Sequence, residues 1–277
     1  MSKQFKDKVV LVTGAARGQG RSHAVRFAEE GADIIAVDIC GQIDSVAYRM
    51  ATADDLHETV NLVEKTGQRI VARQADVRDM ARLQTLIQNG VADLGRLDFV
   101  LANAGIAPVV GQQSQTVAAY VDAIDVLLNG VHFTIEAALP AMLRHPDGGA
   151  IVITSSTMGF KSFSPTYDTR SHGSAGYVAA KHGLIGLMRY YATVLAEKNI
   201  RVNTVHPTGV ATPMIMNPEG EQYAAEHPEW TIAMRNLLQV PLLDVEDVTE
   251  AMVYLCGRSG RYITGTTLVV DAGFLAK

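Results

Sequence analysis

The sequence predicts a doubly wound α/β fold, in which a parallel sheet carries helices on both faces. Two observations predict it. Short apolar runs rich in β-branched residues alternate along the chain with longer amphipathic segments, as in successive strand–helix–strand units. Polar and glycine residues follow several of the apolar runs directly, and such sheets bind ligands beyond the carboxyl ends of their strands. We therefore expect one site along that edge of the sheet.

Seven strands and at least five helices are expected in a single domain spanning residues 1–277, since no linker, repeat or low-complexity tract divides the chain. The strands cover Val9–Thr13, Asp33–Asp38, Arg69–Ala75, Leu97–Ala102, Ala150–Ser155, Arg201–His206 and Thr267–Val270. The helices include Asp54–Thr66, Met80–Leu94, Val117–Leu143, Gly176–Lys198 and Glu246–Gly257. Right-handed crossovers then give the strand order 3-2-1-4-5-6-7.

The first strand runs into the glycine-rich segment 14–20, which an amphipathic helix follows. Strand, glycine turn and helix are the context that a dinucleotide-binding fingerprint requires. Gly14 suits the tight turn, Gly18 a close approach of the backbone to a pyrophosphate, and Gly20 the packing of helix on strand. The alternative is a glycine-rich loop without a ligand. The context favours a Rossmann fold that binds a dinucleotide.

Asp38 ends the second strand, where a carboxylate binds both ribose hydroxyls of NAD and repels the extra phosphate of NADP. Arg17 in the glycine turn is a contrary signal, because a basic side chain pairs with such a phosphate. Asp38 occupies the place of the phosphate itself, so we predict NAD.

Tyr177 and Lys181 are four residues apart and so share one face of a helix. A tyrosine hydroxyl normally titrates near ~10, and a neighbouring ammonium lowers that pKa. The pair therefore suits proton exchange with an alcohol or a carbonyl. Tyr and Lys also occur at this spacing on many exposed helices. The pair therefore indicates a catalytic site only in combination with the dinucleotide site.

With these motifs the chain resembles the short-chain dehydrogenase/reductase family nearly from end to end. The shared segments are Thr13–Gly20, Asp76-Val77, Asn103–Gly105, Asn129, Ser155-Ser156, Tyr177 with Lys181, and Pro207–Met214. The resemblance implies that Tyr177 donates and accepts the proton and that Ser156 binds the substrate oxygen. It implies further that Lys181 binds the nicotinamide ribose and tunes Tyr177, and that Asn129 anchors a proton-relay water. Ser155 is then a capping or packing residue.

The same resemblance implies the cofactor contacts, with Asp76 and Val77 beside the adenine and Val210 and Thr212 at the nicotinamide carboxamide. The expected cofactor-binding residues are Gly14, Arg17, Gly18, Gln19, Gly20, Asp38, Asp76, Val77, Asn103, Ala104, Gly105, Thr154, Tyr177, Lys181, Pro207, Val210 and Thr212. Two positions depart from the family pattern: Ala102 stands where Asn is usual, and Thr208 stands where Gly is usual, next to Gly209.

Two further departures indicate a branch of the family. Gln19 replaces the usual apolar residue, and the connection Ile39–Ala53 is much longer than the usual ~2–6 residues. The combination resembles the mycofactocin-dependent branch, whose best-known members look like the actinobacterial carveol dehydrogenases. The resemblance implies an insertion that covers a tightly bound, non-exchanging NAD, and mycofactocin as an external redox partner.

The expected function is an NAD-dependent oxidoreductase that interconverts a secondary alcohol, alicyclic or terpenoid, and its ketone. The segment 212–240 is expected to cover the substrate, with Met214 and Trp230 as apolar contacts beside Ser156; these residues would otherwise only pack on the sheet. Residues 160–175 either shape the pocket or form an external loop. An ordinary exchanging enzyme for a sugar, steroid or acyl substrate and a noncatalytic NAD-binding sensor are the alternatives.

Composition and charge argue against several classes of binding partner. A net charge of −5 with scattered charges argues against nucleic acid or an anionic membrane surface, and no apolar run is long enough to span a membrane. Two cysteines, Cys40 and Cys256, indicate no disulfide framework and a cytoplasmic protein. No metal-ligand spacing is present. The helices Val117–Leu143 and Gly176–Lys198 resemble the family's subunit interfaces, which implies a homotetramer.

Overall fold

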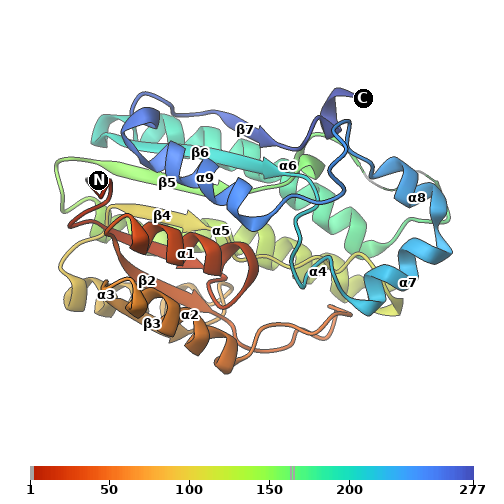
Figure 1. The fold of residues 1–277 in the computed structure, drawn as a ribbon, viewed down its shortest axis with the longest axis horizontal. Coiled ribbons are helices and arrows are strands. Elements are labelled where there is room, and N and C mark those ends of the chain that lie inside the picture. The colour runs from red at the N-terminus through yellow and green to blue at the C-terminus, as the bar shows by residue number, and fades with distance from the viewer. Residues whose placement is uncertain (1–2, 163, 165) are drawn as a thin grey trace.

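The computed structural model describes residues 3–162, 164 and 166–277, and this part of the chain forms a single α/β domain with a seven-stranded sheet (Figure 1). All the strand pairs are parallel and the order is β3-β2-β1-β4-β5-β6-β7, as predicted. The strands are β1 (Val9–Thr13), β2 (Asp33–Asp38), β3 (Ile70–Gln74), β4 (Phe99–Ala102), β5 (Gly149–Thr154), β6 (Ile200–Pro207) and β7 (Thr267–Val270).

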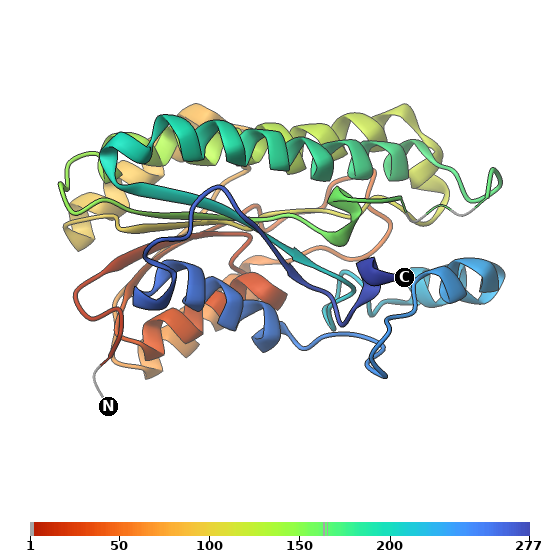
Figure 2. The ribbon, with the colours of Figure 1, turned by 90° about the horizontal axis from the view of Figure 1, so that it is seen from above.

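Helices cover both faces of the sheet (Figure 2). The helices are α1 (Gly18–Glu29), α2 (Ala53–Lys65), α3 (Met80–Leu94), α4 (Val117–Ile124), α5 (Gly130–Met142), α6 (His172–Val194), α7 (Pro218–Glu226), α8 (Pro228–Ala233) and α9 (Val245–Cys256). One face carries α3, α4, α5 and α6, and the other carries α1, α2 and α9. Helices α7 and α8 stand apart, beyond the carboxyl ends of the strands (Figure 1).

The strand sequences explain this arrangement. In β1, Val10 and Val12 pack into the core under α1 and α9, whereas Val9 and Leu11 pack into the core under α3 and α5. All four side chains are at most 2% exposed. A strand that is apolar on both faces is stable only between two helical layers, so the continuous apolar run dictates a central parallel strand.

The long helix predicted over Val117–Leu143 is not regular. A π-helical turn, Asp125–Asn129, separates α4 from α5. The helix predicted from Gly176 begins four residues earlier, at His172, because the Ser171 side chain accepts a hydrogen bond from the Ser174 N–H and caps it. Both segments carry predicted site residues, because Asn129 ends the π-helical turn and Tyr177 lies in α6.

The connection between β2 and α2 is the predicted insertion. It contains no regular element, yet Ile43, Val46 and Tyr48 are buried in the main core. Its end is fixed by a capping box, in which the Thr52 side chain and the Asp55 side chain each bind the other's backbone N–H. The insertion is therefore packed as part of the domain.

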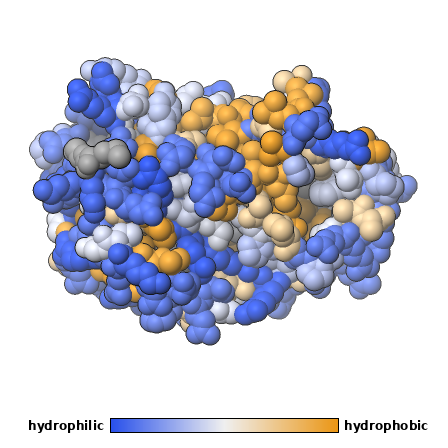
Figure 3. Space-filling view, in the orientation of Figure 1, coloured by the Kyte–Doolittle hydropathy of each residue, from blue (hydrophilic) through white to orange (hydrophobic). Residues whose placement is uncertain are grey.

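Apolar side chains also gather on the surface near the C-terminal end of the chain (Figure 3). Leu237, Leu238 and Val240, in the segment between α8 and α9, are exposed, and the N–H groups of Leu237 and Leu238 bind the Ala272 carbonyl near that end. Within residues 3–162, 164 and 166–277, no helix combines the length and the apolar character needed to cross a bilayer.

Candidate active site

One large cavity lies along the carboxyl ends of the strands, with about 1240 Å³ of empty space, part of it open to solvent. Every residue predicted to bind the cofactor lines this cavity, and so do Ser156 and Met214. Asn129 and Trp230 do not line it. The fold thus brings nearly all the predicted residues together, while their role as ligands stays a prediction.

The glycine turn accepts no larger residues at two positions. Gly14 has φ +68°, and a Cβ there would lie 2.8 Å from the Ala104 Cα. A Cβ on Gly20 would lie 2.0 Å from the Gly14 carbonyl oxygen. Helix α1 begins at Gly18 without a side-chain cap from Arg17. Its first N–H groups therefore have no intrahelical or capping acceptor, and a pyrophosphate at this end of the helix would satisfy them.

Asp38 is 7% exposed and ties the glycine turn to the end of β2. Its Oδ2 accepts a hydrogen bond from the Ala16 N–H at 3.0 Å, and its Oδ1 accepts one from the Cys40 N–H at 3.0 Å. An ionised carboxylate has about four acceptor sites. Asp38 therefore retains acceptor capacity toward the cavity, where ribose hydroxyls would bind.

Asn103 organises the floor of the cavity between β1 and β5. Its Nδ2 donates to the Thr13 carbonyl at 3.1 Å, and its Oδ1 accepts from the Thr154 hydroxyl at 3.0 Å. The Thr13 hydroxyl in turn accepts from the N–H groups of Asn103 and Ala104. These bonds position the segment after β4 directly beneath the glycine turn.

Tyr177 lies half-buried on α6, and its side chain is hydrogen-bonded to Ser156. Burial raises the pKa of Tyr177, and the Ser156 hydrogen bond lowers it in part. Ser156 is held in turn by the Met158 N–H, which donates to its Oγ at 3.1 Å. The two hydroxyls therefore form one unit that can share a proton with a substrate oxygen placed between them.

Lys181 lies below Tyr177, with its Nζ 5.6 Å from the centre of the tyrosine ring. Its ammonium donates to the Thr154 carbonyl at 2.8 Å. Burial lowers the pKa of Lys181 to about 7, so the side chain is only partly charged at neutral pH. Burial is the largest influence on the Tyr177 pKa in this structure, and the lowering of that pKa by Lys181 stays a prediction.

Asn129 ends the π-helical turn, and its Nδ2 donates to Asp125 Oδ1 at 2.9 Å. The turn packs on the face of α6 that carries Tyr177, through Leu127 and Leu128. A π turn shifts the backbone hydrogen-bond ladder by one residue and is frequent at functional sites. This geometry is compatible with a backbone-bound relay water, although the amide itself is held by Asp125.

His206 is a site residue to which the sequence reasoning assigned no chemistry. It is completely buried, its Nδ1 lies 2.8 Å from the Ser156 carbonyl and its Nε2 lies 2.8 Å from the Thr204 hydroxyl. Burial lowers the pKa of His206 to about 4, so the ring is neutral. Since a carbonyl only accepts, Nδ1 carries the proton. His206 therefore fixes the backbone of Ser156, while Ser155 donates to the Lys181 carbonyl at 3.1 Å, as a packing residue would.

The insertion forms one wall of the cavity. Ile39, Ile43, Tyr48, Met50 and Ala51 all line it. Hydrogen bonds along its length hold the insertion to the domain. Gln74 Nε2 donates to the Ile39 carbonyl at 2.9 Å, and Ser45 Oγ donates to Asp122 Oδ2 at 2.7 Å. The Tyr48 hydroxyl accepts from the Ala107 N–H at 3.1 Å, and the Arg49 carbonyl accepts from Arg17 at 2.8 Å. The side chain of Gln42 also binds three backbone carbonyls of the same segment. The wall is therefore attached at its beginning, middle and end.

The substrate end of the site is apolar. Met214 lines the cavity, whereas Trp230 packs in a neighbouring cluster with Met158, Phe274 and the flank of Tyr177. Phe274 comes from the C-terminal end of the chain and is 1% exposed. No local signal in the sequence connects it with Tyr177, because the contact depends only on the tertiary fold.

Residues 160–175 have two parts. The ring of Phe160 lies tilted against that of His206, with ring centres 4.5 Å apart, whereas Tyr167 is exposed and contacts Arg170. Phe163 and Pro165 lie outside the described residues. None of the described residues between 160 and 175 lines the cavity.

In the described ranges 3–162, 164 and 166–277, no group of three histidine, cysteine, aspartate or glutamate side chains is placed to hold a metal ion. Cys40 and Cys256 are free thiols.

Residues 14–275 match the family model described as Enoyl-(Acyl carrier protein) reductase. Together with the fold and the Ser156, Tyr177 and Lys181 arrangement, this match shows that the chain belongs to the short-chain dehydrogenase/reductase family, whose members are oxidoreductases.

The chain is 42% identical over 283 residues to (-)-trans-carveol dehydrogenase from Rhodococcus erythropolis, covering 99% of both proteins. Its fold is similar to that of carveol dehydrogenase from Mycobacterium avium in complex with NAD, with a TM-score of 0.90, 43% identity and 99% coverage of both chains. A short chain dehydrogenase from Mycobacterium paratuberculosis bound to NAD is also similar, with a TM-score of 0.90 and 38% identity, over 99% of this chain and 100% of that one.

Proposed function

We propose that this chain is an NAD-dependent oxidoreductase that interconverts a secondary alcohol and its ketone. The observation that carries the proposal is the hydrogen-bonded Ser156–Tyr177 pair above Lys181, placed in the same cavity as the glycine turn. The NAD bound by two similar structures supports the cofactor. A noncatalytic NAD sensor would have no use for this proton-transferring arrangement.

The residues present fit a dinucleotide. The uncapped start of α1 would hold the pyrophosphate, Asp38 the adenosine ribose, and Lys181 the nicotinamide ribose. Bound NAD would supply the hydride acceptor at the nicotinamide ring, or the donor when reduced. The protein supplies position and the proton path.

In the oxidation, Tyr177 as phenolate takes the proton of the substrate hydroxyl while a hydride leaves the carbinol carbon. Ser156 donates a hydrogen bond to the substrate oxygen and holds it within reach of Tyr177. The π turn that ends at Asn129 lies next to Tyr177 and would anchor the water that returns the proton to solvent. The ketone reduction reverses each of these steps.

The substrate class we propose is an alicyclic or terpenoid alcohol. The cavity that Tyr177 lines is also lined by Ile106, Val126, Leu127, Met214 and Ile215, which offer no charged partner to a polyhydroxylated or anionic substrate. The similarity to carveol dehydrogenases supports this choice.

A pair of assays tests the function. Carveol and NAD are supplied under steady-state conditions, first alone and then with an artificial electron acceptor. Turnover that depends on the acceptor supports carveol oxidation with a retained cofactor and, with it, an external redox partner such as mycofactocin. Turnover with NAD alone identifies an ordinary exchanging dehydrogenase, and inactivity toward any alcohol while NAD binds would favour a sensor.

The pH dependence of kcat/KM should follow the ionisation of the Tyr177 hydroxyl. Because burial raises its pKa, the phenolate is scarce at neutral pH and increases about tenfold per pH unit below that pKa. We expect kcat/KM for alcohol oxidation to rise from about pH 7 to 9 and that for ketone reduction to fall. Loss of the Lys181 charge above a pKa of about 7 makes the rise less steep. An oxidation rate that falls over this interval would contradict the assignment.

Asp38 should determine the preference for NAD. Asp38→Asn keeps an oxygen for one of the two backbone N–H groups that Asp38 binds and removes the charge that repels a 2′-phosphate. We expect the ratio of NADP to NAD dissociation constants to fall about tenfold, as for the loss of one charge-assisted interaction of ~1.5 kcal/mol. Asp33→Asn, at the other end of β2, is the control. An unchanged ratio, measured by calorimetry, would show that Asp38 does not face the ribose.

We also propose that the protein is a homotetramer. Helices α4 and α6 and the C-terminal end of α5 expose apolar residues, among them Val117, Val121, Leu143, Tyr190 and Val194. These helices resemble the family's interface helices, and closed symmetry is usual for homo-oligomers. Light scattering at micromolar concentration should give four times the chain mass; a monomeric mass would contradict the proposal.

A further inference from the structure

Gln19 carries a buried polar atom without a partner. Across residues 3–162, 164 and 166–277, two buried side-chain nitrogen or oxygen atoms lack a hydrogen bond, Gln19 Oε1 and His23 Nε2. Of these two residues only Gln19 lines the cavity. A buried polar group without a hydrogen bond costs about 1–3 kcal/mol. A glutamine in this place is therefore a cost to the protein alone, which a ligand with a suitable donor would offset.

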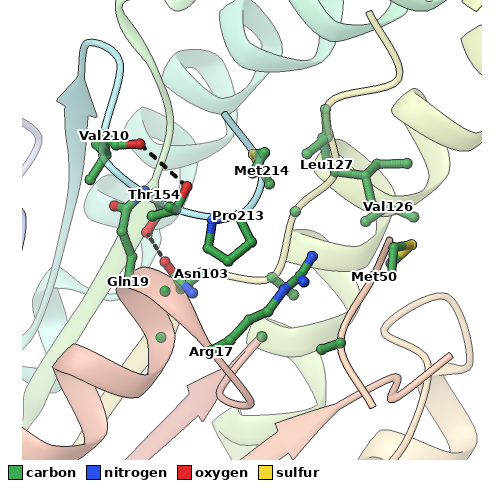
Figure 4. A pocket seen from close by; sticks show the side chains of 18 of the residues that line it. Arg17, Gln19, Met50, Asn103, Val126, Leu127, Thr154, Val210, Pro213 and Met214 are labelled. Atoms are coloured by element: carbon green, nitrogen blue, oxygen red, sulfur yellow. Dashed lines mark hydrogen bonds between the residues drawn. The ribbon is translucent and has the colours of Figure 1, made fainter. Parts of the chain in front are cut away.

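The direction of the side chain indicates which part of a dinucleotide it meets. Arg17 and Gln19 leave the glycine turn in different directions (Figure 4). Arg17 extends toward Met50 of the insertion, which begins directly after Asp38, whereas Gln19 extends toward Thr154 and Val210. The Asp38 side is where the adenosine ribose would bind. Gln19 thus points to the opposite end, where Lys181 binds the Thr154 carbonyl.

The two hydroxyl groups near Gln19 already donate to other protein atoms. The Thr154 hydroxyl has one hydrogen, which it donates to Asn103 Oδ1 at 3.0 Å. The Thr212 hydroxyl donates to the Val210 carbonyl at 3.3 Å. Neither hydroxyl hydrogen is therefore free for Gln19 Oε1.

The donors of a dinucleotide indicate which of its groups can bind Gln19 Oε1. Pyrophosphate oxygens only accept hydrogen bonds, so they cannot satisfy an amide oxygen. The donors at the nicotinamide end are the ribose hydroxyls and the carboxamide NH₂. A carboxamide presents N–H beside C=O, and a glutamine amide presents C=O beside N–H, so the two can form a pair of parallel hydrogen bonds.

We propose that Gln19 is a positioning residue that binds the carboxamide of the nicotinamide ring. This inference rests on the proposed function, because it requires a nicotinamide cofactor. Gln19 would fix the rotation of the ring relative to Tyr177 and would help to retain the dinucleotide. An apolar residue at position 19 cannot perform this role.

The first test compares Gln19→Met with the wild type, both stripped of bound dinucleotide. Methionine has a similar length and no strong hydrogen-bonding group. We expect the free protein to melt at the same or a higher temperature, because the unpaired oxygen is gone, and the dissociation constant for NAD to rise about tenfold. Gln88→Met, on the exposed face of α3, is the control and should change neither quantity. Gln19→Leu repeats the test should the methionine variant fold poorly.

The second test identifies the partner atom with 3-acetylpyridine adenine dinucleotide, in which a methyl group replaces the carboxamide NH₂. The wild type should bind NAD about tenfold more tightly than this analogue, and Gln19→Met should bind the two about equally. A substitution that weakens both dinucleotides by the same factor, or neither, would overturn the proposal. A wild type that binds no dinucleotide at all would instead refute the proposed function, and the inference with it.

Discussion

Replacing Tyr177 with phenylalanine is expected to lower turnover by about 10²–10⁴-fold while NAD binding stays nearly unchanged. The substitution removes one oxygen atom, which is the atom that exchanges the proton with the substrate. The ring remains, and it packs against Leu128 and the cluster around Phe274, so the shape of the cavity is kept. The loss should therefore appear in kcat and in kcat/KM alike.

The measurement compares single-turnover rates and NAD affinity for the variant and the wild type. Tyr190→Phe, on the exposed side of the same helix, is the matched control and should have wild-type activity. Turnover of Tyr177→Phe within about threefold of wild type would remove Tyr177 from the catalytic role, because a general acid–base step contributes far more than this.

The fold could be predicted from the sequence because its strands are apolar on both faces. The bounds of β1, β2 and β7 agree with the prediction, and the other strands differ by one or two residues at their ends. The π turn at Asp125–Asn129 could not be predicted, because one shifted hydrogen bond hardly changes the apolar pattern. The sequence does not predict the start of α6 at His172, because the polar residues before Tyr177 carry no apolar helical pattern.

The sequence predicts which residues form the site, but it does not predict their pKa values. The glycine turn, Asp38, Ser156 and Tyr177 follow strands whose carboxyl ends must meet. The pKa of Lys181 depends on burial, which a spacing of four residues does not report. His206 lies beside Ser156 only because β5 and β6 are neighbours in register, and Phe274 reaches Tyr177 from the C-terminal end of the chain.

The insertion is expected to control how fast the bound cofactor is released. We expect purified protein to retain near-stoichiometric NAD(H) that does not exchange readily, because five residues of the insertion form a wall of the cavity and hydrogen bonds attach that wall to the rest of the domain. A cofactor behind such a wall leaves only after the wall opens, which slows dissociation more than association. Gel filtration, heat denaturation and assay of the supernatant for NAD(H) measure the retained amount.

Variants of the insertion separate a closing wall from a surface loop. Replacing residues 41–50 by a short turn should give protein that binds and exchanges NAD within seconds. The milder double variant Ser45→Ala with Tyr48→Phe removes two anchoring hydroxyls and keeps the apolar lining, so we expect faster exchange without loss of the fold. Thr193→Ala, which removes a hydroxyl bonded only within α6, is the control.

The order of exchange rates decides between the two interpretations. If the wall controls release, exchange should be slowest in the wild type and the control, faster in the double variant, and fastest in the shortened protein, while single-turnover chemistry changes little because Ser156, Tyr177 and Lys181 are untouched. Wild-type protein that is isolated free of cofactor and exchanges NAD as quickly as the shortened variant would show that the insertion lines the cavity without controlling it. The same result would remove the main reason to expect an external redox partner, since a cofactor that leaves freely can be reoxidised in solution.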